Sequence, residues 1–193
     1  EVSGGAGSFV ANVHISMLSM GIKSQIITRE FSTLDKCTVV MPLTKLKQKL
    51  RALNSKLTSL FKIINPKYAL FGVQKSPLKF SQIRSILDEC EPKILIFYWT
   101  SYFIGYQTIL DLKRNYPYAE VFFICLDEAF LTGGCHYSTG CDRYQKSCLD
   151  CPATSLKSMK YQINRNFESK IDILDNISPT VIYPSSQLKA MVL

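Results

Sequence analysis

The sequence predicts an α/β fold, in which a parallel sheet is covered by helices on both faces. Two observations lead to this prediction. The runs ILIFYW (94–99) and VFFICL (121–126) are continuously apolar, as in strands that are buried on both faces. Segments whose apolar residues recur with helical spacing separate these runs, and such an alternation of strands and helices is typical of parallel sheets.

The elements are expected in the following order. Residues 8–28 read as a helix that stops at Gly21 and a short strand after it, because glycine commonly ends a helix. A second helix is expected over 42–64, where apolar residues step by three and four until Asn65-Pro66 ends the pattern. The remaining elements are a helix at 80–90, strands at 93–99, 119–126 and 179–184, helices at 101–114 and 155–174, and the start of a helix after 184.

Length and composition indicate a single domain. The chain has 193 residues, 47% of them hydrophobic, which is enough for one buried core. Its apolar runs are far shorter than the ~20 residues that a membrane-spanning helix needs. The glycines at 4–7 lead into a helix without the strand that precedes such a turn in α/β folds, and the chain stops inside a predicted helix. We therefore expect one domain, 1–193, truncated at both ends.

Positive charge is concentrated in one segment. The net charge is +8, and residues 36–87 contain eleven Lys or Arg and no Asp or Glu. On the predicted helix 42–64, Lys45, Lys49 and Lys56 stand opposite the apolar stripe. Such a face is either an ordinary solvated surface or a contact for an anionic membrane, and the absence of acids favours the membrane. No nucleic-acid motif accompanies it, so we expect no nucleic-acid partner.

The stretch GGAGS is a candidate anion site, formed by Gly4, Gly5, Ala6, Gly7 and Ser8 as a loop ahead of a helix. Glycines let the backbone approach a ligand, and the N–H groups and dipole of the first helical turn favour an anion. The stretch is neither a G-x-G-x-x-G motif nor a P-loop. A tight turn with Ser8 as the helix cap explains it equally well.

Four of the seven cysteines lie in one loop, 132–152: Cys135, Cys141, Cys148 and Cys151. The last two form C-x-x-C, the usual half of a zinc site. A loop of ~20 residues without secondary structure is uncommon in a compact domain, and a metal would supply its order. We favour a structural Zn²⁺ ion over disulfides, redox use, free thiols or an iron–sulfur cluster, and His136 could replace one thiolate.

The other three cysteines are predicted to be core thiols, because they stand in apolar or mixed segments: Cys37, Cys90 and Cys125. An odd number of cysteines with three of them scattered in this way indicates a reducing compartment. We therefore expect a cytoplasmic location.

Further candidate residues stand at the carboxyl ends of the two buried strands, where ligand crevices form in open α/β sheets. Asp127 and Glu128 follow one strand. Adjacent carboxylates point apart on an extended backbone, so they are not an acid/base pair, and a helix cap or an ion pair is the plainer interpretation. Trp99 and Tyr98 end the other strand, where they either line a pocket or pack.

Together these motifs resemble the N-terminal half of bacterial family 4 glycosyltransferases, which have the two-domain GT-B fold and make exopolysaccharide, capsule or O-antigen sugars. The stretch LDEAFLTGGCHYSTGCDRYQKSCLDCP (126–152) is similar to their pattern HDMWxxTGGCHYxxGCxxxxxxCxxCP, most closely from Thr132 to Pro152. The opening GGAG and the strand that ends in Trp99 are similar as well. Where the family has His-Asp-Met-Trp, this chain reads LDEA (126–129), so that only Asp127 is retained.

The resemblance implies a Rossmann-like, acceptor-side domain of a retaining hexosyltransferase, which moves a sugar from a nucleotide-diphosphate donor to a glycan or lipid-linked acceptor. It implies a catalytic role for Asp127, a diphosphate facing the Gly4–Ser8 stretch, and a cleft wall of Trp99, Thr132, Gly133 and Gly134. No catalytic metal is expected, since helix N-termini and basic groups stabilise the leaving diphosphate in this fold. The C-terminal domain, which binds the donor in the family, is absent. The chain alone should therefore be inactive, and the enzyme should be cytoplasmic and peripheral at the inner membrane.

Two other classes of function stay open. Leu126 in place of the family histidine favours a non-catalytic, glycan-binding or scaffold relative. The cysteine loop is also compatible with a zinc-stabilised interaction domain that has no role with sugars. Thermal protection of the full-length protein by a nucleotide-sugar would separate the transferase from both alternatives.

Overall fold

The structure is a computed structural model of the 193-residue chain, and it describes residues 5–28, 34, 36–39, 64–68, 70, 78–101 and 103–190. The predicted basic helix at 42–64, with Lys45, Lys49 and Lys56, lies outside the described residues except for Ile64, and so does Gly4. Within the described ranges, no helix has the length and apolarity needed to cross a bilayer.

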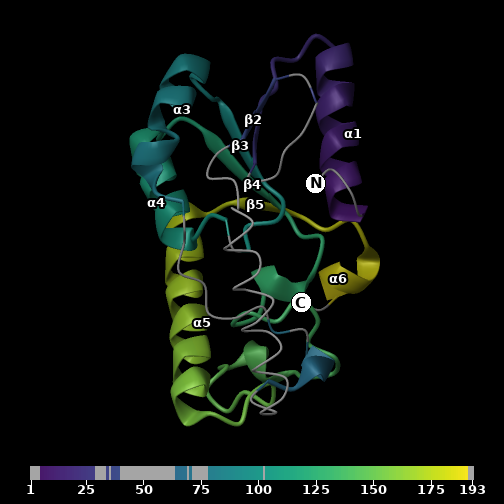
Figure 1. Cartoon of the computed structure of the whole chain (residues 1–193), viewed down its shortest axis with the longest axis vertical. Helices are drawn as coiled ribbons and strands as arrows, with labels where there is room; N and C mark the ends of the chain where they lie inside the picture. The colour runs from purple at the N-terminus through teal and green to yellow at the C-terminus, as the bar shows by residue number, and fades with distance from the viewer. Residues whose placement is uncertain are drawn as a thin grey trace, which may run out of the picture.

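A parallel sheet of three strands forms the centre of the fold (Figure 1). Phe123 in the middle strand pairs with Phe97 on one side and with Val181 on the other. The predicted α/β class and the parallel direction of the strands are confirmed. In their order across the sheet, the strands are β3 (Ile94–Phe97), β4 (Glu120–Ile124) and β5 (Thr180–Ile182).

A separate two-stranded parallel sheet lies near the first helix. The helix α1 (Gly5–Ser19) ends where predicted, since Gly21 in the following turn has a φ of +74°. The strands β1 (Ile26–Thr28) and β2 (Cys37–Val39) then pair in parallel. No element was predicted from the sequence for the residues of β2, so this strand was missed. Figure 1 shows α1 on one side of the fold and α4 and α5 on the other.

The remaining helices follow the predicted alternation. The helix α4 begins later than the predicted residue 101, because Ile104 first pairs with Leu78 as an isolated bridge and Leu78 N–H donates to Phe103 O at 3.1 Å. Gly105 then precedes the helix with an extended backbone. The helices are α3 (Arg84–Cys90), which follows a 3-10 turn at Phe80–Gln82, α4 (Tyr106–Asn115), α5 (Lys157–Ile177) and α6 (Ser186–Ala190). Further 3-10 turns lie at Pro66–Tyr68, Glu128–Phe130 and Arg143–Gln145.

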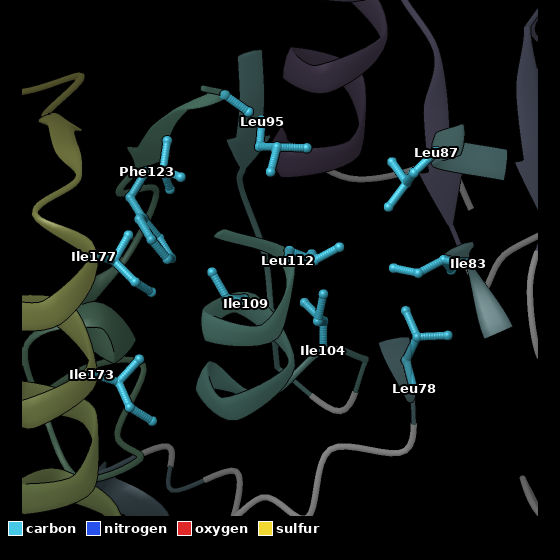
Figure 2. Close-up of a cluster of buried hydrophobic side chains, with 12 residues drawn as sticks. Leu78, Ile83, Leu87, Leu95, Ile104, Ile109, Leu112, Phe123, Ile173 and Ile177 are labelled. Carbon is cyan, nitrogen blue, oxygen red and sulfur yellow. The ribbon is translucent and has the colours of Figure 1, made fainter. Parts of the chain in front are cut away.

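The main core is formed by the three-stranded sheet, the helices α3, α4 and α5, and the segment 78–83 before α3 (Figure 2). Ile109 and Leu112 of α4 stand at its centre, with exposed fractions of 0% and 2%. Burial of an aliphatic side chain of this size stabilises a fold by about 1.5–3 kcal/mol. The other labelled members are Leu78, Ile83, Leu87, Leu95, Ile104, Phe123, Ile173 and Ile177.

A second, smaller core lies beneath the cysteine loop. It consists of Leu70, Cys148, Cys151, Ala153, Ile163 and Phe167. The backbone also ties the chain before this core to the loop, since Ile64 bridges Thr154, Leu70 bridges Cys135, and Asn65 N–H donates to Ala153 O at 2.8 Å. The loop is therefore packed on the first half of α5 rather than extended into solvent.

The cysteines outside the loop do not all behave as predicted. Cys125 is buried, as expected for a core thiol. The prediction for Cys90 is wrong, because α3 buries only Leu87 and leaves Cys90 exposed at its last position. There the Cys90 thiol donates to Gln25 Oε1 at 2.5 Å. The side chain of Cys37 lies outside the described part of the structure.

Candidate functional site at the strand carboxyl ends

The residues that follow β3 and β4 line one small pocket. Parallel strands place their carboxyl ends at the same edge of a sheet, which is why segments far apart in the sequence meet here. The structure thus brings together Trp99 and Asp127, two of the predicted site residues. The polar and aromatic part of the lining consists of Tyr98, Trp99, Thr100, Ser101, Tyr106, Asp127 and His136.

A hydrogen-bonded chain of three side chains crosses this pocket. Asp127 Oδ2 contacts His136 Nδ1, and His136 Nε2 lies 3.1 Å from Ser101 Oγ. With its proton on Nδ1, the imidazole donates to the carboxylate and accepts from the serine hydroxyl. His136 and Ser101 are buried, with exposed fractions of 2% and 9%. The hydrogen bonds to Asp127 and Ser101 therefore fix the imidazole at both of its nitrogens.

Asp127 also caps the 3-10 turn Glu128–Phe130. Its Oδ1 accepts a hydrogen bond from Ala129 N–H at 2.8 Å. The plainer sequence interpretation of Asp127, a cap or an ion pair, thus fits both of its contacts. Glu128 turns elsewhere and accepts from Ser138 N–H, as expected for adjacent carboxylates on an extended backbone.

Sequence reasoning missed the role of His136. It weighed this histidine only as a metal ligand, because the neighbouring residue is Cys135. The available signal was topological: the loop leaves the carboxyl end of β4, so a histidine within it can return to the sheet edge where Asp127 stands. In the structure, His136 lines the strand-end pocket. His136 is not among the residues that line the pocket of the cysteines.

Trp99 covers the imidazole. The two rings stack with their centroids 4.6 Å apart and their planes at 29°. Trp99 is nevertheless 48% exposed, so about half of this large aromatic surface remains accessible beside the pocket. Because His136 is held at both nitrogens, the indole rests on a rigid support. Trp99 is also the single tryptophan of the chain.

The glycine-rich stretch does not form the predicted loop. The helix α1 already begins at Gly5, so Gly5, Ala6, Gly7 and Ser8 belong to its first turn, and Ser8 is not the residue before the helix. Glycine is tolerated there because the first turn of a helix lacks the intrahelical N–H bonds that the interior has. Phe9, one turn further on, contacts Tyr98 of the pocket with ring centroids 6.2 Å apart. The amino end of α1 therefore lies near the carboxyl end of β3.

The turn Thr132–Gly134, predicted as a cleft wall, packs on α5 instead of lining the strand-end pocket. Thr132 Oγ1 donates to Cys135 O at 2.6 Å and accepts from Cys135 N–H at 2.9 Å. Gly133 O accepts from Asn166 Nδ2 at 2.8 Å. A Cβ on Gly133 would lie 2.6 Å from Ile163 Cγ2, so only glycine fits there. The structure gives this turn a packing role and separates it from Trp99 and Asp127.

A buried amine holds the same segment from the side of α5. Lys170 is 3% exposed, and its Nζ donates to Ala129 O at 2.5 Å and to Thr132 O. Nζ also lies 5.3 Å from the centroid of the Tyr106 ring. Burial lowers the pKa of Lys170 to about 8. The sequence held a signal for the burial of Lys170. It stands three residues after Phe167 and three residues before Ile173, so it lies on the apolar face of the helix.

All four loop cysteines line one second pocket, on the side of the loop that faces the second core. They are free thiols; Cys148 and Cys151 are buried, and Cys135 and Cys141 are partly buried. The Cys135 thiol donates a hydrogen bond to the Cys151 sulfur, which lowers the pKa of Cys151 to about 6 and raises that of Cys135. As the side chains stand, no three His, Cys, Asp or Glu in the described residues already form a metal-binding group.

The chain matches no family model, no curated protein and no solved structure. Its fold and sites define an α/β domain with a parallel sheet. The strand carboxyl ends hold an Asp–His–Ser chain under an accessible tryptophan, and a four-thiol loop packs beside them.

Replacing Asp127 by asparagine should destabilise the domain by about 2 kcal/mol, because a neutral amide replaces the carboxylate that accepts from the buried His136 and from Ala129 N–H. Urea unfolding measures this change. Asp172→Asn, at an exposed position of α5, is the matched control and should stay within about 0.5 kcal/mol of the wild type. Equal stability of the two variants would mean that the Asp127–His136 contact contributes nothing to the fold.

Proposed function

We propose that the chain is the N-terminal, acceptor-side domain of a retaining glycosyltransferase with the GT-B fold. The full enzyme would move a hexose from a nucleotide-diphosphate donor to a glycan or lipid-linked acceptor in cell-surface polysaccharide synthesis. The observation that supports this proposal most is the meeting of three features at one sheet edge. These are an accessible tryptophan, a buried Asp–His–Ser chain and the amino end of α1, which the Phe9–Tyr98 contact holds nearby.

In the proposed reaction, the amino end of α1 faces the diphosphate of the donor. A helix N-terminus carries partial positive charge and points backbone N–H groups at an anion. Gly5 leaves this surface uncovered, since apart from its chain neighbours and the backbone of its own helix no described atom lies within 4 Å of the place where a Cβ would stand. Trp99 offers an accessible flat ring to a sugar, whose C–H groups suit the negative face of an aromatic system.

The contacts of Asp127 favour a positioning role over direct contact with the substrate. Its two oxygens are engaged by His136 and by Ala129 N–H, so that the carboxylate holds the imidazole on which Trp99 rests. Leu126, where the resembling family has histidine, supplies no polar group. We therefore assign the recognition of substrate in this domain to Trp99 and the amino end of α1.

The reaction that we propose uses no catalytic metal, because helix N-termini and basic groups can stabilise the leaving diphosphate. A C-terminal domain would supply the nucleotide site, so the chain alone should transfer no sugar. The basic segment 36–87 is proposed to contact the anionic inner membrane from the cytoplasm. Its lysines 45, 49 and 56 lie outside the described residues.

Isothermal titration of the full-length protein with nucleotide-sugars tests this proposal. We expect saturable binding that weakens at least about tenfold in Gly5→Val, because a branched side chain would keep the diphosphate away from the backbone. Asn12→Val, two turns along the exposed face of α1, is the control and should bind as the wild type does. If no nucleotide-sugar binds, or if both variants bind equally well, the proposed donor contact is wrong.

A non-catalytic glycan-binding domain is the second candidate, and Leu126 together with the accessible Trp99 favours it. This domain would bind a glycan and no nucleotide-sugar. A titration with glycans, followed by fluorescence, tests this candidate. The difference in emission between the wild type and Trp99→Phe isolates the fluorescence of Trp99, so a glycan that shifts this difference binds at the Trp99 ring. The titrations with nucleotide-sugars and with glycans therefore separate the two candidates. A protein that binds neither ligand would fit a zinc-stabilised interaction domain.

A further inference from the structure

We propose that Cys135, Cys141, Cys148 and Cys151 bind one structural zinc ion as a four-thiolate site. This inference concerns the stability of the loop and does not depend on the proposed function. Thiolate is the ligand that structural zinc prefers, and four ligands complete its tetrahedral shell. The spacing of the cysteines in the sequence is one observation for this site. The structure supplies a second, because all four side chains line the same pocket.

In the proposed site, the four cysteine side chains turn toward one ion. The sulfurs of Cys135 and Cys151 are already in hydrogen-bond contact, although they are the first and last ligands in the sequence. Cys141 and Cys148 face the same pocket. A cysteine side chain has one heavy-atom rotation, about Cα–Cβ, and this rotation moves Sγ between three wells. The ion would gather sulfurs that the backbone has already brought around one space.

Two of the sulfurs each have one backbone donor. Gly133 N–H donates to the sulfur of Cys148, and Ala153 N–H donates to the sulfur of Cys151. Hydrogen bonds of this kind orient the ligands of a metal and stabilise their charge. Asn164 Oδ1 of α5 fixes the ligand loop further, since it accepts from Cys148 N–H at 2.9 Å. These contacts would hold two of the four ligands in place from the surrounding protein.

The surroundings favour a metal over the alternatives. The rest of the lining is mainly apolar or aromatic, including Tyr68, Ala153 and Ile163. Its one cationic side chain among the described residues, Arg143, donates to the backbone and the carboxylate of Asp150, so four thiolates there need a further cation as a partner. No disulfide links the described cysteines, and a bond between the touching pair would leave Cys141 and Cys148 unused. His136 is held by Asp127 and Ser101 in the other pocket, so the ligand set contains sulfur only.

The proposed ion would fasten the loop to two neighbours. Cys148 and Cys151 belong to the second core with Ile163 and Phe167 of α5, and Cys135 bridges Leu70. Zinc binding would release the protons of the thiols that are protonated in the free protein, without any change of oxidation state. Because His136 directly follows Cys135, the metal would also steady the strand-end pocket.

Metal analysis of protein purified under reducing conditions is the first test, and we expect about one zinc ion per chain. Cobalt substitution should give a sulfur-to-cobalt charge-transfer band and the visible bands of tetrahedral Co²⁺. Single Cys→Ser variants at the four ligand positions should lose most of the metal. The matched controls are Cys90→Ser, an exposed thiol, and Cys125→Ser, a buried thiol outside the loop, and both should retain it. His136→Gln should retain it as well.

A chelator added to the wild type gives a readout that does not depend on how the variants fold. Removal of the ion should lower the melting temperature by about 10 °C or more, and added zinc should restore it. Less than about 0.1 ion per chain in the reduced wild type, together with no response to zinc, would overturn the proposal. So would a disulfide among the four cysteines in the native protein, or iron and sulfide in place of zinc.

Discussion

Gly133→Ala should destabilise the domain by about 3 kcal/mol, an unusually large effect for one added methyl group. Its Cβ would lie 2.6 Å from Ile163 Cγ2, 2.8 Å from Ile163 O and 3.2 Å from Cys148 Cβ. The nearest of these atoms belongs to a side chain that is 1% exposed, and the second belongs to the backbone of α5, so neither can move aside. Relief requires the turn to move away from the helix. That movement breaks the bond from Asn166 to Gly133 O.

Chemical denaturation measures this effect, and Gly5→Ala is the control. Gly133 is a crowded glycine and Gly5 is an open one, so the two variants add the same methyl group to different surroundings. Gly5→Ala should leave stability unchanged or raise it by up to about 1 kcal/mol, because apart from its chain neighbours and its own helix backbone no described atom lies within 4 Å of the new Cβ. The double variant Gly133→Ala/Ile163→Ala should not return to the level of Ile163→Ala alone, because the contact with Ile163 O remains. A denaturation midpoint for Gly133→Ala equal to that of the wild type would show that the turn does not lie against α5.

The strands and the long helices could be predicted because burial marks the sequence over many residues. Continuous apolar runs identified β3 and β4, and apolar spacing identified α5 within three residues at each end. Two short pieces were missed: the three-residue strand β2, and the first turn of α1, which was predicted as a loop. Glycines gave no helical signal there, although the first turn of a helix tolerates them.

The candidate site was predictable only in part, because tertiary contacts decide it. The carboxyl ends of parallel strands meet at one edge, so Trp99 and Asp127 could be placed together from the sequence. The contact of His136 with Asp127 depends on the path of a loop, and no local pattern specifies that path. Gly133 was predicted as part of a cleft wall, and in the structure a Cβ on it would meet Ile163. A glycine in a loop shows that space is short without showing what fills it.

Lys170→Met should destabilise the domain by about 3 kcal/mol, because the carbonyls of Ala129 and Thr132 would lose a buried donor. Unsatisfied buried carbonyls cost about 1–3 kcal/mol each, and removal of a desolvated charge returns part of that cost. Lys157→Met, at the exposed start of α5, is the control and should stay within about 0.5 kcal/mol of the wild type. Equal unfolding free energies for the two variants would contradict the role of Lys170.

The pH dependence of Lys170→Met tests the same contact independently. Burial lowers the pKa of Lys170 from 10.5 to about 8, although the Asp127 carboxylate and the negative charge of nearby cysteine thiolates oppose the shift. Between these two values the unfolded chain binds more protons than the folded one, so stability from this group rises with pH. The wild type should therefore gain stability over Lys170→Met as the pH increases from about 8 to about 10. Its neutral amine still has two hydrogens for the two carbonyls, so the gain comes without loss of the contacts. A difference that stays constant over this range would mean that Lys170 titrates as an exposed lysine does, and that its amine is not buried beneath the loop.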